Sequence, residues 1–523
     1  MRTKRIKLLL VLSLILLPSF SLAEVSSTQS ISGIYYHVEG NKDRSFYPAN
    51  EADNLYEGTF DFKNIPLKGH EAFGNIEYRS TDDKLIDPQG FSIERMYMGA
   101  RDQVQEILIG DFYQSFSEYS LSNALKGLKL SFGNEKSSRL ILLGGIDTSR
   151  WENLWEERHE DSASRRHIWG ARLENNYLNK KLALNFNYAG ARDDKAFINS
   201  SNSPILVNIL SVESRYDINS FVTAYSELSQ SFTDEDIRDG AVKTRPDHAV
   251  KLGTDLNIND YTLSSVYSRI GNHFTTTSGF SAQDLETLNF YGLWFLPWNI
   301  KFTHYLYSDR DNLSDTKATT TRQLNPGGKF NLNLPLDVGL EFSADMRKRF
   351  STDKETNGKT YTYSSRLTRD FGAFFSEFGY TKEIISDRIY SANERSSDII
   401  SFALDGYFTL KDVNFSWNLS EDIDHTSHKE VCEADFSTTT NAGLKLTFPS
   451  TFTIEARLSF SNNDYYLNDT DSENNNYFLG ISRQLVGDSL AFSVFYERKG
   501  YSYYGGDNNY ADNIFQAKLS YTF

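Results

Sequence analysis

Cysteine, proline and long apolar runs are scarce in this chain of 523 residues. A single cysteine, Cys432, excludes an intramolecular disulfide, and the absence of C-x-x-C-H excludes covalent c-type haem. Ten prolines and no Gly/Ser-rich spacer leave no linker, so we expect one domain instead of several. Past residue 23, no apolar run approaches the length of about 20 residues that a transmembrane helix needs. The formal net charge of −16 offers no basic face for nucleic acid.

Catalytic motifs are also missing. The sequence contains no G-x-x-x-x-G-K-[ST], H-E-x-x-H or G-x-S-x-G motif. Ser, His and Asp are plentiful, but in no spacing that pairs a nucleophile with a base. We therefore expect neither an enzyme nor a bound cofactor.

The first 23 residues have the three parts of a secretory signal peptide. Four basic residues precede an apolar run over 8–17, and small Ser21 and Ala23 then form a cleavage site. We predict cleavage after Ala23, which leaves 24–523 as one domain and takes the net charge from −16 to −20. We expect the first strand near Ile31, so no plug domain is predicted before it.

The dominant pattern has a period of two residues. Apolar and polar residues alternate in 452-FTIEARLSF-460, 413-VNFSWNL-419, 182-LALNFNY-188 and 338-VGLEFSADMR-347. Strict alternation predicts strands with one apolar and one polar face. A soluble β-sandwich alternates in the same way, so the period alone does not decide the fold class.

Short and long connections also alternate along the chain. Turns such as Asn179-Lys180, Pro297-Trp298, Lys411-Asp412 and Pro449-Ser450 alternate with polar stretches at 193–203, 231–246, 271–283, 385–396, 423–435, 463–475 and 500–510. This rhythm is typical of a barrel whose turns lie on one side of a membrane and whose loops lie on the other. We predict an all-β, antiparallel up-and-down transmembrane β-barrel of about 26 strands, within roughly 22 to 28.

The last nine residues, 515-FQAKLSYTF-523, carry the most specific pattern. Apolar residues alternate with polar ones, and aromatic Tyr521 and Phe523 close the stretch. It resembles the closing strand of bacterial outer-membrane β-barrel proteins, although that family often has Gly where Lys518 stands here. The resemblance implies an integral protein of a Gram-negative outer membrane, in contact with membrane lipid and lipopolysaccharide. It also implies that the barrel-assembly machinery reads Tyr521 and Phe523 and pairs this strand with the first.

A second resemblance involves 109-IGDFYQSFSEYSLSNALKGLKLSF-132. Gly110, Asp111, Phe116, Ser117 and Gly127, followed by Trp151 and Trp155, are similar to an element of large, poorly characterised outer-membrane barrels. The resemblance implies no activity. The two glycines permit a bend or a close backbone approach, and ordinary strand glycines are the alternative.

Three further stretches are candidate sites. His425, His428 and Cys432, with Glu430 or Glu433, offer metal-ligand types in a predicted external loop, or form a polar loop without a metal. The stretch 469-DTDSENNN-476 places carboxylates as Ca²⁺ ligands require, or forms a solvated loop tip. The stretch 151-WENLWEERHED-161 is a candidate loop helix that folds inward or stays outside. We assign no metal site.

The polar faces of the strands predict the pore lining. We expect Glu341, Asp345, Arg347, Glu455 and Arg457 to face the lumen, with mixed charge and at most a weak cation preference. A barrel of this size encloses a wide hole. We interpret the chain as a channel for passive or export transport. One alternative is a sheath around a periplasmic or electron-transfer protein, since 307-YSDRDN-312 is similar to a motif in barrels of that sheath type. Another alternative is a surface adhesin or structural barrel.

Overall fold

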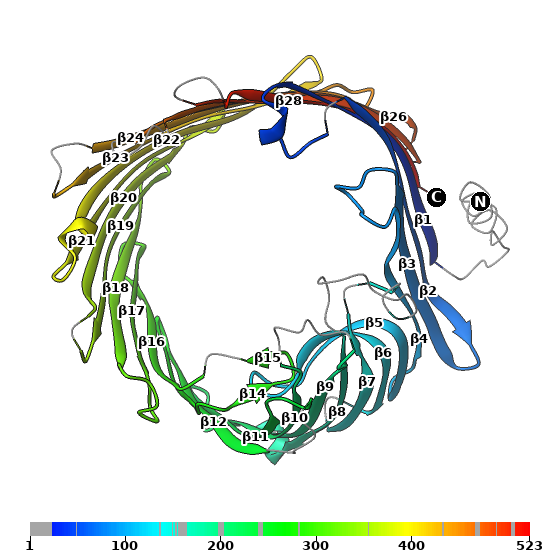
Figure 1. Cartoon of the computed structure of the whole chain (residues 1–523), viewed down its shortest axis with the longest axis vertical. Helices are drawn as coiled ribbons and strands as arrows, with labels where there is room; N and C mark the ends of the chain where they lie inside the picture. The colour runs from blue at the N-terminus through cyan, green and yellow to red at the C-terminus, as the bar shows by residue number, and fades with distance from the viewer. Residues whose placement is uncertain are drawn as a thin grey trace.

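The computed structural model describes residues 24–48, 50–134, 137–148, 150–151, 154, 165–196, 203–238, 244–280, 283–353, 355–430, 434–465, 471–487, 489–503 and 508–522. These residues form one 26-stranded antiparallel sheet and a separate two-stranded hairpin. Figure 1 shows the sheet as a ring that encloses a lumen. Among the described residues, no helix is long and apolar enough to cross a membrane.

The strands follow one another around the ring in chain order. They are β1 (Glu24–Gly40), β2 (Glu51–Leu67), β3 (His70–Thr81), β4 (Phe91–Arg101), β5 (Gln105–Ser115), β6 (Ser122–Gly133), β7 (Ser138–Asp147), β8 (Arg166–Tyr177), β9 (Leu182–Asp193), β10 (Leu206–Asp217), β11 (Val222–Asp234), β12 (Arg245–Ile258), β13 (Tyr261–Ile270), β16 (Leu285–Leu296), β17 (Ile300–Asp311), β18 (Thr321–Leu334), β19 (Val338–Ser351), β20 (Asn357–Asp370), β21 (Phe374–Asp387), β22 (Arg395–Leu410), β23 (Val413–His428), β24 (Ala434–Thr447), β25 (Phe452–Asp464), β26 (Ser472–Val486), β27 (Leu490–Tyr503) and β28 (Tyr510–Thr522). The separate hairpin is β14 (Thr275–Thr276) and β15 (Gly279–Phe280), and short 3-10 helices occur at η1 (Lys42–Arg44), η3 (Leu178–Lys180) and η4 (Ser391–Asn393).

The C-terminal strand closes the barrel, as the sequence predicts. β28 pairs with β1 from Thr522 opposite Thr28 to Tyr510 opposite Gly40, so neither terminal strand is left as an edge. The expected position of the first strand is wrong, since β1 begins at Glu24 and not near Ile31. The residues before Ile31 are mostly Ser, Thr and Gln, which show no apolar alternation but still pair with β2.

The predicted alternation of short and long connections is confirmed. Several of the short turns contain residues with positive φ, such as Lys411 (φ 47°) and Asp412 (φ 65°) between β22 and β23. Two successive positive φ values give the hairpin turn that matches strand twist. Since every strand is antiparallel to the next, all short turns lie at one rim and all longer loops at the other.

The stretch 423–435 is an exception to the predicted loops. β23 continues to His428 and β24 resumes at Ala434, so His425 and His428 lie on a strand. The apolar alternation ends earlier because this part of the hairpin needs no lipid-facing side chains, while its backbone ladder continues. His425 pairs with Phe436, and His428 Nε2 lies 2.8 Å from Asp435 Oδ2.

The outer face of the wall carries large apolar side chains. Ile109, Leu210, Leu228, Phe342, Leu479 and Phe515 are each 46–53% exposed, although apolar side chains of this size are normally buried in water-soluble proteins. A membrane barrel needs an apolar outer band of this kind where it contacts hydrocarbon. Its closed wall also leaves no unpaired sheet edge in lipid.

Aromatic rings cover glycines across neighbouring strands. In the described sheet, eight strand glycines lie directly opposite an aromatic residue, and a Cβ at these glycines would come within 2.1 to 2.6 Å of the ring: Gly58 with Tyr78, Gly74 with Phe62, Gly99 with Phe73, Gly190 with Trp169, Gly253 with Tyr225, Gly292 with His304, Gly327 with Tyr305, and Gly406 with Trp417. These pairs fix the register of the strands, because a one-residue slip would drive each ring into a side chain.

Candidate functional site: the barrel lumen

Residues directly opposite each other on neighbouring strands lie on the same face of the sheet, so the register shows which residues face the lumen. Arg457 of β25 lies opposite Phe478, Phe478 opposite Glu497, Glu497 opposite Ile514, and Ile514 opposite Tyr36. Tyr36 stacks on Tyr47 at 5.0 Å between ring centroids. Tyr47 belongs to the β1–β2 loop, which Figure 1 shows inside the ring. All of these residues therefore lie on the lumen face.

The residues predicted to line the pore share this face. On β19, Glu341, Asp345 and Arg347 lie on the face opposite to the outward Phe342. Glu341 Oε2 forms an ion pair with Lys329 Nζ at 2.6 Å. On β25, Glu455 Oε1 lies 3.1 Å from Arg457 Nε. Five strands separate β19 from β25, so these residues do not form one cluster. Their role in a pore stays a prediction.

Loop 116–121 folds into the lumen and packs on the inner wall. Phe116 is 3% exposed and Leu121 is fully buried, and a Cβ at Gly170 of β8 would lie 2.7 Å from the Phe116 ring. The apolar cluster beneath the loop draws on β5 to β10 and contains Leu108, Phe112, Leu125, Ile141, Leu143, Ile168, Ala189, Ala191, Val207 and Ile209. A patch of the lumen wall is thus apolar and covered by the chain itself.

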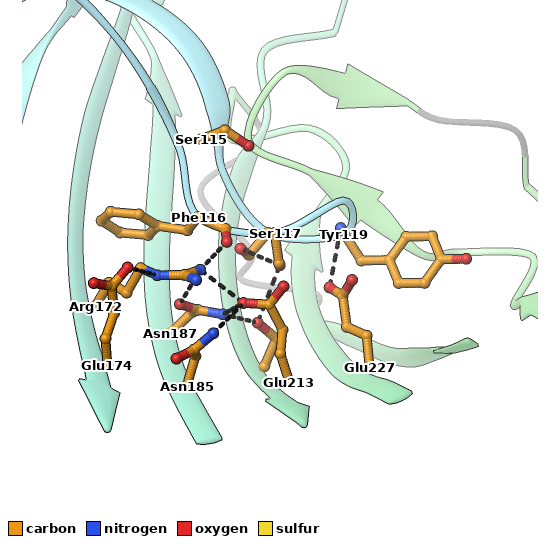
Figure 2. Close-up of polar contacts among 12 residues, drawn as sticks. Ser115, Phe116, Ser117, Tyr119, Arg172, Glu174, Asn185, Asn187, Glu213 and Glu227 are labelled. Atoms are coloured by element: carbon orange, nitrogen blue, oxygen red, sulfur yellow. Dashed lines mark hydrogen bonds and ion pairs between the residues drawn. The ribbon is translucent and has the colours of Figure 1, made fainter. Parts of the chain in front are cut away.

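Arg172 of β8 anchors this loop (Figure 2). Its guanidinium donates to the Phe116 carbonyl, to Glu213 Oε2 at 2.7 Å and to Glu174 Oε1 at 2.8 Å. Asn187 Nδ2 donates to Glu213 Oε2 at 3.3 Å. The Arg172 side chain is only 12% exposed, so these bonds form away from bulk water.

Glu227 of β11 holds the other side of the loop. Glu227 Oε1 accepts the Tyr119 backbone N–H at 3.1 Å (Figure 2). It also accepts the Ser229 hydroxyl at 3.0 Å. Glu213 and Glu227 face each other directly across β10 and β11, a like-charge pair that is unfavourable by itself. Arg172 and the loop amide compensate these two carboxylates, so the loop and the wall stabilise each other.

A second loop rests on the first. The β13–β16 loop contains β14 and β15, and Thr277 Oγ1 donates to the Ser120 carbonyl at 3.0 Å and to Asn123 Oδ1 at 2.8 Å. Phe274 is fully buried against Tyr119, with the two rings edge to face. Burial raises the pKa of the Tyr119 hydroxyl. We refer to residues 116–121 and 273–278 together as the lumen shelf.

A second group of inward contacts lies where β28, β1, β2 and β3 meet. The Tyr36 hydroxyl donates to Asp83 Oδ2 at 2.7 Å in the β3–β4 loop. In the same loop, Asp87 accepts from Arg150 Nη1 at 2.6 Å and from Ser92 Oγ at 2.8 Å. Burial opposes ionisation of Asp87, but these bonds and the Gln89 amide hold its pKa below the ordinary value.

The structure gives Gly110, Asp111 and Gly127 a physical role. Gly110 has φ +113°, and a Cβ there would lie 2.2 Å from the Met96 carbonyl oxygen. A Cβ at Gly127 would lie 2.1 Å from the Gly144 carbonyl oxygen. The two glycines therefore permit the bend and close approach that direct the β5–β6 hairpin inward, where Asp111 accepts from Lys126 Nζ and Trp151 Nε1, both at 2.6 Å. Phe116 and Ser117 lie in the shelf.

Some sequence candidates lie outside the described residues: Cys432, Glu433, Trp155, Phe523, 469–470 and most of 151–161. Of the other predicted calcium ligands, Asp471 accepts the Tyr465 N–H at 2.9 Å and Glu473 lies on β26. Among the residues that the structure does describe, no three His, Cys, Asp or Glu side chains are grouped so as to hold a metal ion. Sequence analysis missed Arg172, Glu213 and Glu227. Their only signal is charge at lumen-facing positions, which many other strands share.

The lumen and its closed wall define the chain as a transmembrane-type β-barrel. No protein-family model matches the chain, and no curated protein sequence matches it. Among solved structures it is similar to the translocation pore of the P pilus usher PapC, with 9% identity over 95% of this chain and 100% of that chain and a TM-score of 0.40. It is also similar to the siderophore receptor PirA from Pseudomonas aeruginosa (8% identity, 96% and 80% covered, TM-score 0.40) and to the outer membrane transporter YddB from Escherichia coli (8% identity, 97% and 81% covered, TM-score 0.44). Likenesses this distant add nothing to the functional inference, which rests on the chain's own geometry.

Proposed function

We propose that this protein is an outer-membrane conduit, a barrel whose lumen carries solutes or an exported molecule across the outer membrane. The observation that supports it most is the size of the closed wall. With strands about 4.8 Å apart and tilted by about 40°, 26 strands give a backbone diameter of about 50 Å. The shelf packs on β8 to β12, so it narrows the lumen from one side.

The lining supports the same function. The lumen-facing residues of β19 and β25 combine both charge signs in local ion pairs. Rings of one charge are what give strong ion selectivity. The proposed conduit therefore discriminates little by charge and mainly by size, and it includes no catalytic step.

Conductance of the purified full-length barrel in a planar bilayer tests this proposal. A conduit gives a stable step that exceeds the step of a 16-stranded porin measured beside it, because conductance increases with lumen cross-section. The matched variant pair is Arg172→Ala, which frees the shelf, and Arg215→Ala, whose side chain is 59% exposed and outside the shelf. If neither the wild-type barrel nor Arg172→Ala conducted ions, the result would contradict the proposal.

A sheath around a lumen-bound protein is the second candidate. The observation that favours it is a hollow of about 220 Å³ on the lumen side of β23 to β27, lined by polar groups such as Asn418, Asn441 and Arg457 beside the Phe478 ring. Arg457 lies over that ring at 4.0 Å. Mild extraction from native membrane, with mass spectrometry and a visible spectrum, separates the two. A stoichiometric partner in the lumen would support the sheath and exclude an open conduit.

The proposal includes assembly in the outer membrane. Tyr521 is 48% exposed on the outer face of β28, opposite Gln29 of β1, where the assembly machinery and then membrane lipid and lipopolysaccharide would meet it. Tyr521→Ala should slow insertion of the barrel more than loss of the similarly exposed Tyr363 on β20 does. Equal insertion rates for the two variants would contradict a signal at Tyr521.

A further inference from the structure

Four cations on neighbouring strands face outward near the loop-side rim of the wall. The strands β17, β18, β19 and β20 lie side by side (Figure 1). Arg310 of β17 lies directly opposite Arg322 of β18, and Lys348 of β19 lies directly opposite Lys359 of β20. Arg322 also lies opposite Phe350, two residues from Lys348, so the two pairs are diagonal neighbours. We refer to Arg310, Arg322, Lys348 and Lys359 as the outer cation row.

The outer cation row lies at the loop-side edge of the apolar band. Lys348 is on the same face of β19 as Phe342, which is 49% exposed on the outside of the barrel. The outward residues of β19 before Lys348 are all apolar: Val338, Leu340, Phe342, Ala344 and Met346. A strand rises about 3.3 Å per residue, and a tilt of about 40° leaves about 2.5 Å of height per residue. Lys348 therefore lies about 25 Å from Val338 in height, which is the height of an apolar band, so the row meets the level of the lipid head groups.

The charges of the outer cation row are not neutralised by the described part of the chain. Like charges directly opposite each other destabilise a sheet, and the row contains two such pairs. Within the described ranges, no ion pair involves any of the four cations. Glu286 lies opposite Arg310, but its Oε1 accepts the Tyr267 hydroxyl at 2.7 Å and it forms no ion pair with Arg310. Arg310 Nε is buried without a hydrogen-bond partner among the described residues. The row therefore calls for an anion from outside the chain.

The next outward cation along the wall is paired within the chain. Lys382 of β21 lies opposite Tyr363 on the outer face, and its Nζ donates to both carboxylate oxygens of Asp398 at 2.8 and 3.0 Å. The Tyr380 hydroxyl donates to the same carboxylate. The chain thus supplies a carboxylate to Lys382 and none to the outer cation row, so the lack of carboxylates is specific to β17 to β20.

Phosphate is the anion that fits both the chemistry and the position of the outer cation row. Arg presents a planar fork of donors that binds phosphate through two hydrogen bonds, and Lys binds phosphate as a point charge. The row crosses four strands about 4.8 Å apart, so it extends over about 14 Å and has room for more than one phosphate group. Directly below it, Met346 and Phe342 offer an apolar surface. A lipid matches this arrangement, because its acyl chains lie along the apolar surface while its head group meets the cations.

We propose that the outer cation row is a binding site for the phosphorylated head group of a lipid in the outer leaflet of the membrane. The phosphates neutralise the two like-charge pairs, and the acyl chains lie along the outer face of β17 to β20. The proposal assigns one sector of the wall as a specific site, whereas lipid contact is expected all around the barrel. It goes beyond the conduit function and does not depend on it, because the row lies on the outer face and not in the lumen.

Lipid binding by the purified barrel in detergent tests the proposal. Native mass spectrometry measures the affinity for lipid A with two phosphates and, as a control, for zwitterionic phosphatidylethanolamine. Each cation near an anionic lipid surface contributes about fivefold in affinity, so Arg310→Gln with Arg322→Gln should weaken lipid A binding about thirtyfold. Binding of phosphatidylethanolamine should not change. Unchanged lipid A binding in this double variant would overturn the proposal.

A matched pair of single variants tests which face of the wall binds the lipid. Lys348 and Arg349 are adjacent on β19, so their side chains lie on opposite faces, Lys348 outside and Arg349 in the lumen. Lys348→Gln should weaken lipid A binding about fivefold, and Arg349→Gln should leave it unchanged. Both variants change the net charge of the barrel equally. Equal effects would therefore show general charge attraction in place of a site, and would overturn the proposal.

Urea unfolding from vesicles gives a second readout and separates lipid from free phosphate. In phosphatidylcholine vesicles, Arg310→Gln with Arg322→Gln should be at least as stable as the wild type, because it removes a like-charge pair. Lipid A in the vesicles should raise the urea midpoint of the wild type more than that of the double variant, and inorganic phosphate should raise neither. Equal shifts with lipid A, or an equally large shift with inorganic phosphate, would overturn the proposal. A wild-type barrel that binds lipid A but conducts nothing would support this site and contradict only the conduit.

Discussion

Loss of the Arg172 guanidinium should release the lumen shelf. Arg172→Ala removes the donors to the Phe116 carbonyl and Glu213, and leaves Glu213 facing Glu227 with no cation between them. Removal of one partner from a buried ion pair costs about 3 to 5 kcal/mol. Because Arg172 and Glu213 are 12% and 25% exposed, we expect the lower end, about 3 kcal/mol. That value corresponds to a roughly hundredfold increase in shelf opening.

Hydrogen exchange at the Tyr119 amide measures this opening, since the amide donates to Glu227 in the docked shelf. Its exchange should accelerate roughly a hundredfold in Arg172→Ala and remain unchanged in the surface control Arg215→Ala. The double variant Arg172→Ala with Glu213→Ala should recover part of the protection, because no uncompensated carboxylate remains. Unchanged Tyr119 exchange in Arg172→Ala, or a double variant as open as the single one, would refute the reasoning.

Three further outcomes are expected. Gly406→Ala should lower the free energy of unfolding, measured in urea from vesicles, by about 1 to 3 kcal/mol, because its Cβ would lie 2.2 Å from the indole of Trp417. The control Gly358→Ala should cost less, since a Cβ there has nothing within 4 Å. Equal losses in the two variants would contradict the packing of rings over glycines. The pKa of Asp87 is lowered in the folded state, so its bond to Arg150 stabilises the β3–β4 loop above the unfolded pKa of about 3.9 and is lost as the pH falls through the folded value. Exchange of the Gly90 amide should therefore rise below about pH 4 in the wild type, and Asp87→Asn should remove that pH dependence. Reversal potentials across a salt gradient should show at most a weak cation preference that Glu455→Gln barely changes, since Glu455 is already paired; strong selectivity would contradict the mixed lining.

The sequence by itself determined the wall of this protein. Alternation such as that of 452–460 sets which side chains face lipid and which face the lumen, because strand geometry alone places successive residues on opposite faces. The same rule places Glu341 and Arg457 on the lumen face. The alternating short and long connections predicted the up-and-down order and the approximate strand number. The pairing of the closing strand, which carries Tyr521, with β1 was expected from its resemblance to the closing strands of outer-membrane barrels.

The metal-ligand stretch shows where local pattern fails. His425 and His428 look like loop residues because the apolar alternation ends before them, yet backbone pairing continues to His428. A strand that extends beyond the lipid needs hydrogen bonds but no apolar face, so its sequence resembles a loop. The early start of β1 at Glu24 has the same cause.

Only the tertiary structure decided what lies inside the wall. The shelf depends on contacts between distant segments: Ser117 meets Ser211 94 residues away, Tyr119 meets Glu227 108 residues away, and Thr277 meets Ser120 157 residues away. No local periodicity encodes such partners, because each is set by where strands far apart in the chain come together around the ring. The short ladder between β4 and β5, which runs only from Tyr97 to Arg101 on β4, is of the same kind. Gly110 permits the bend, but only the apolar wall of β7 to β10 draws the hairpin inward and interrupts the ladder.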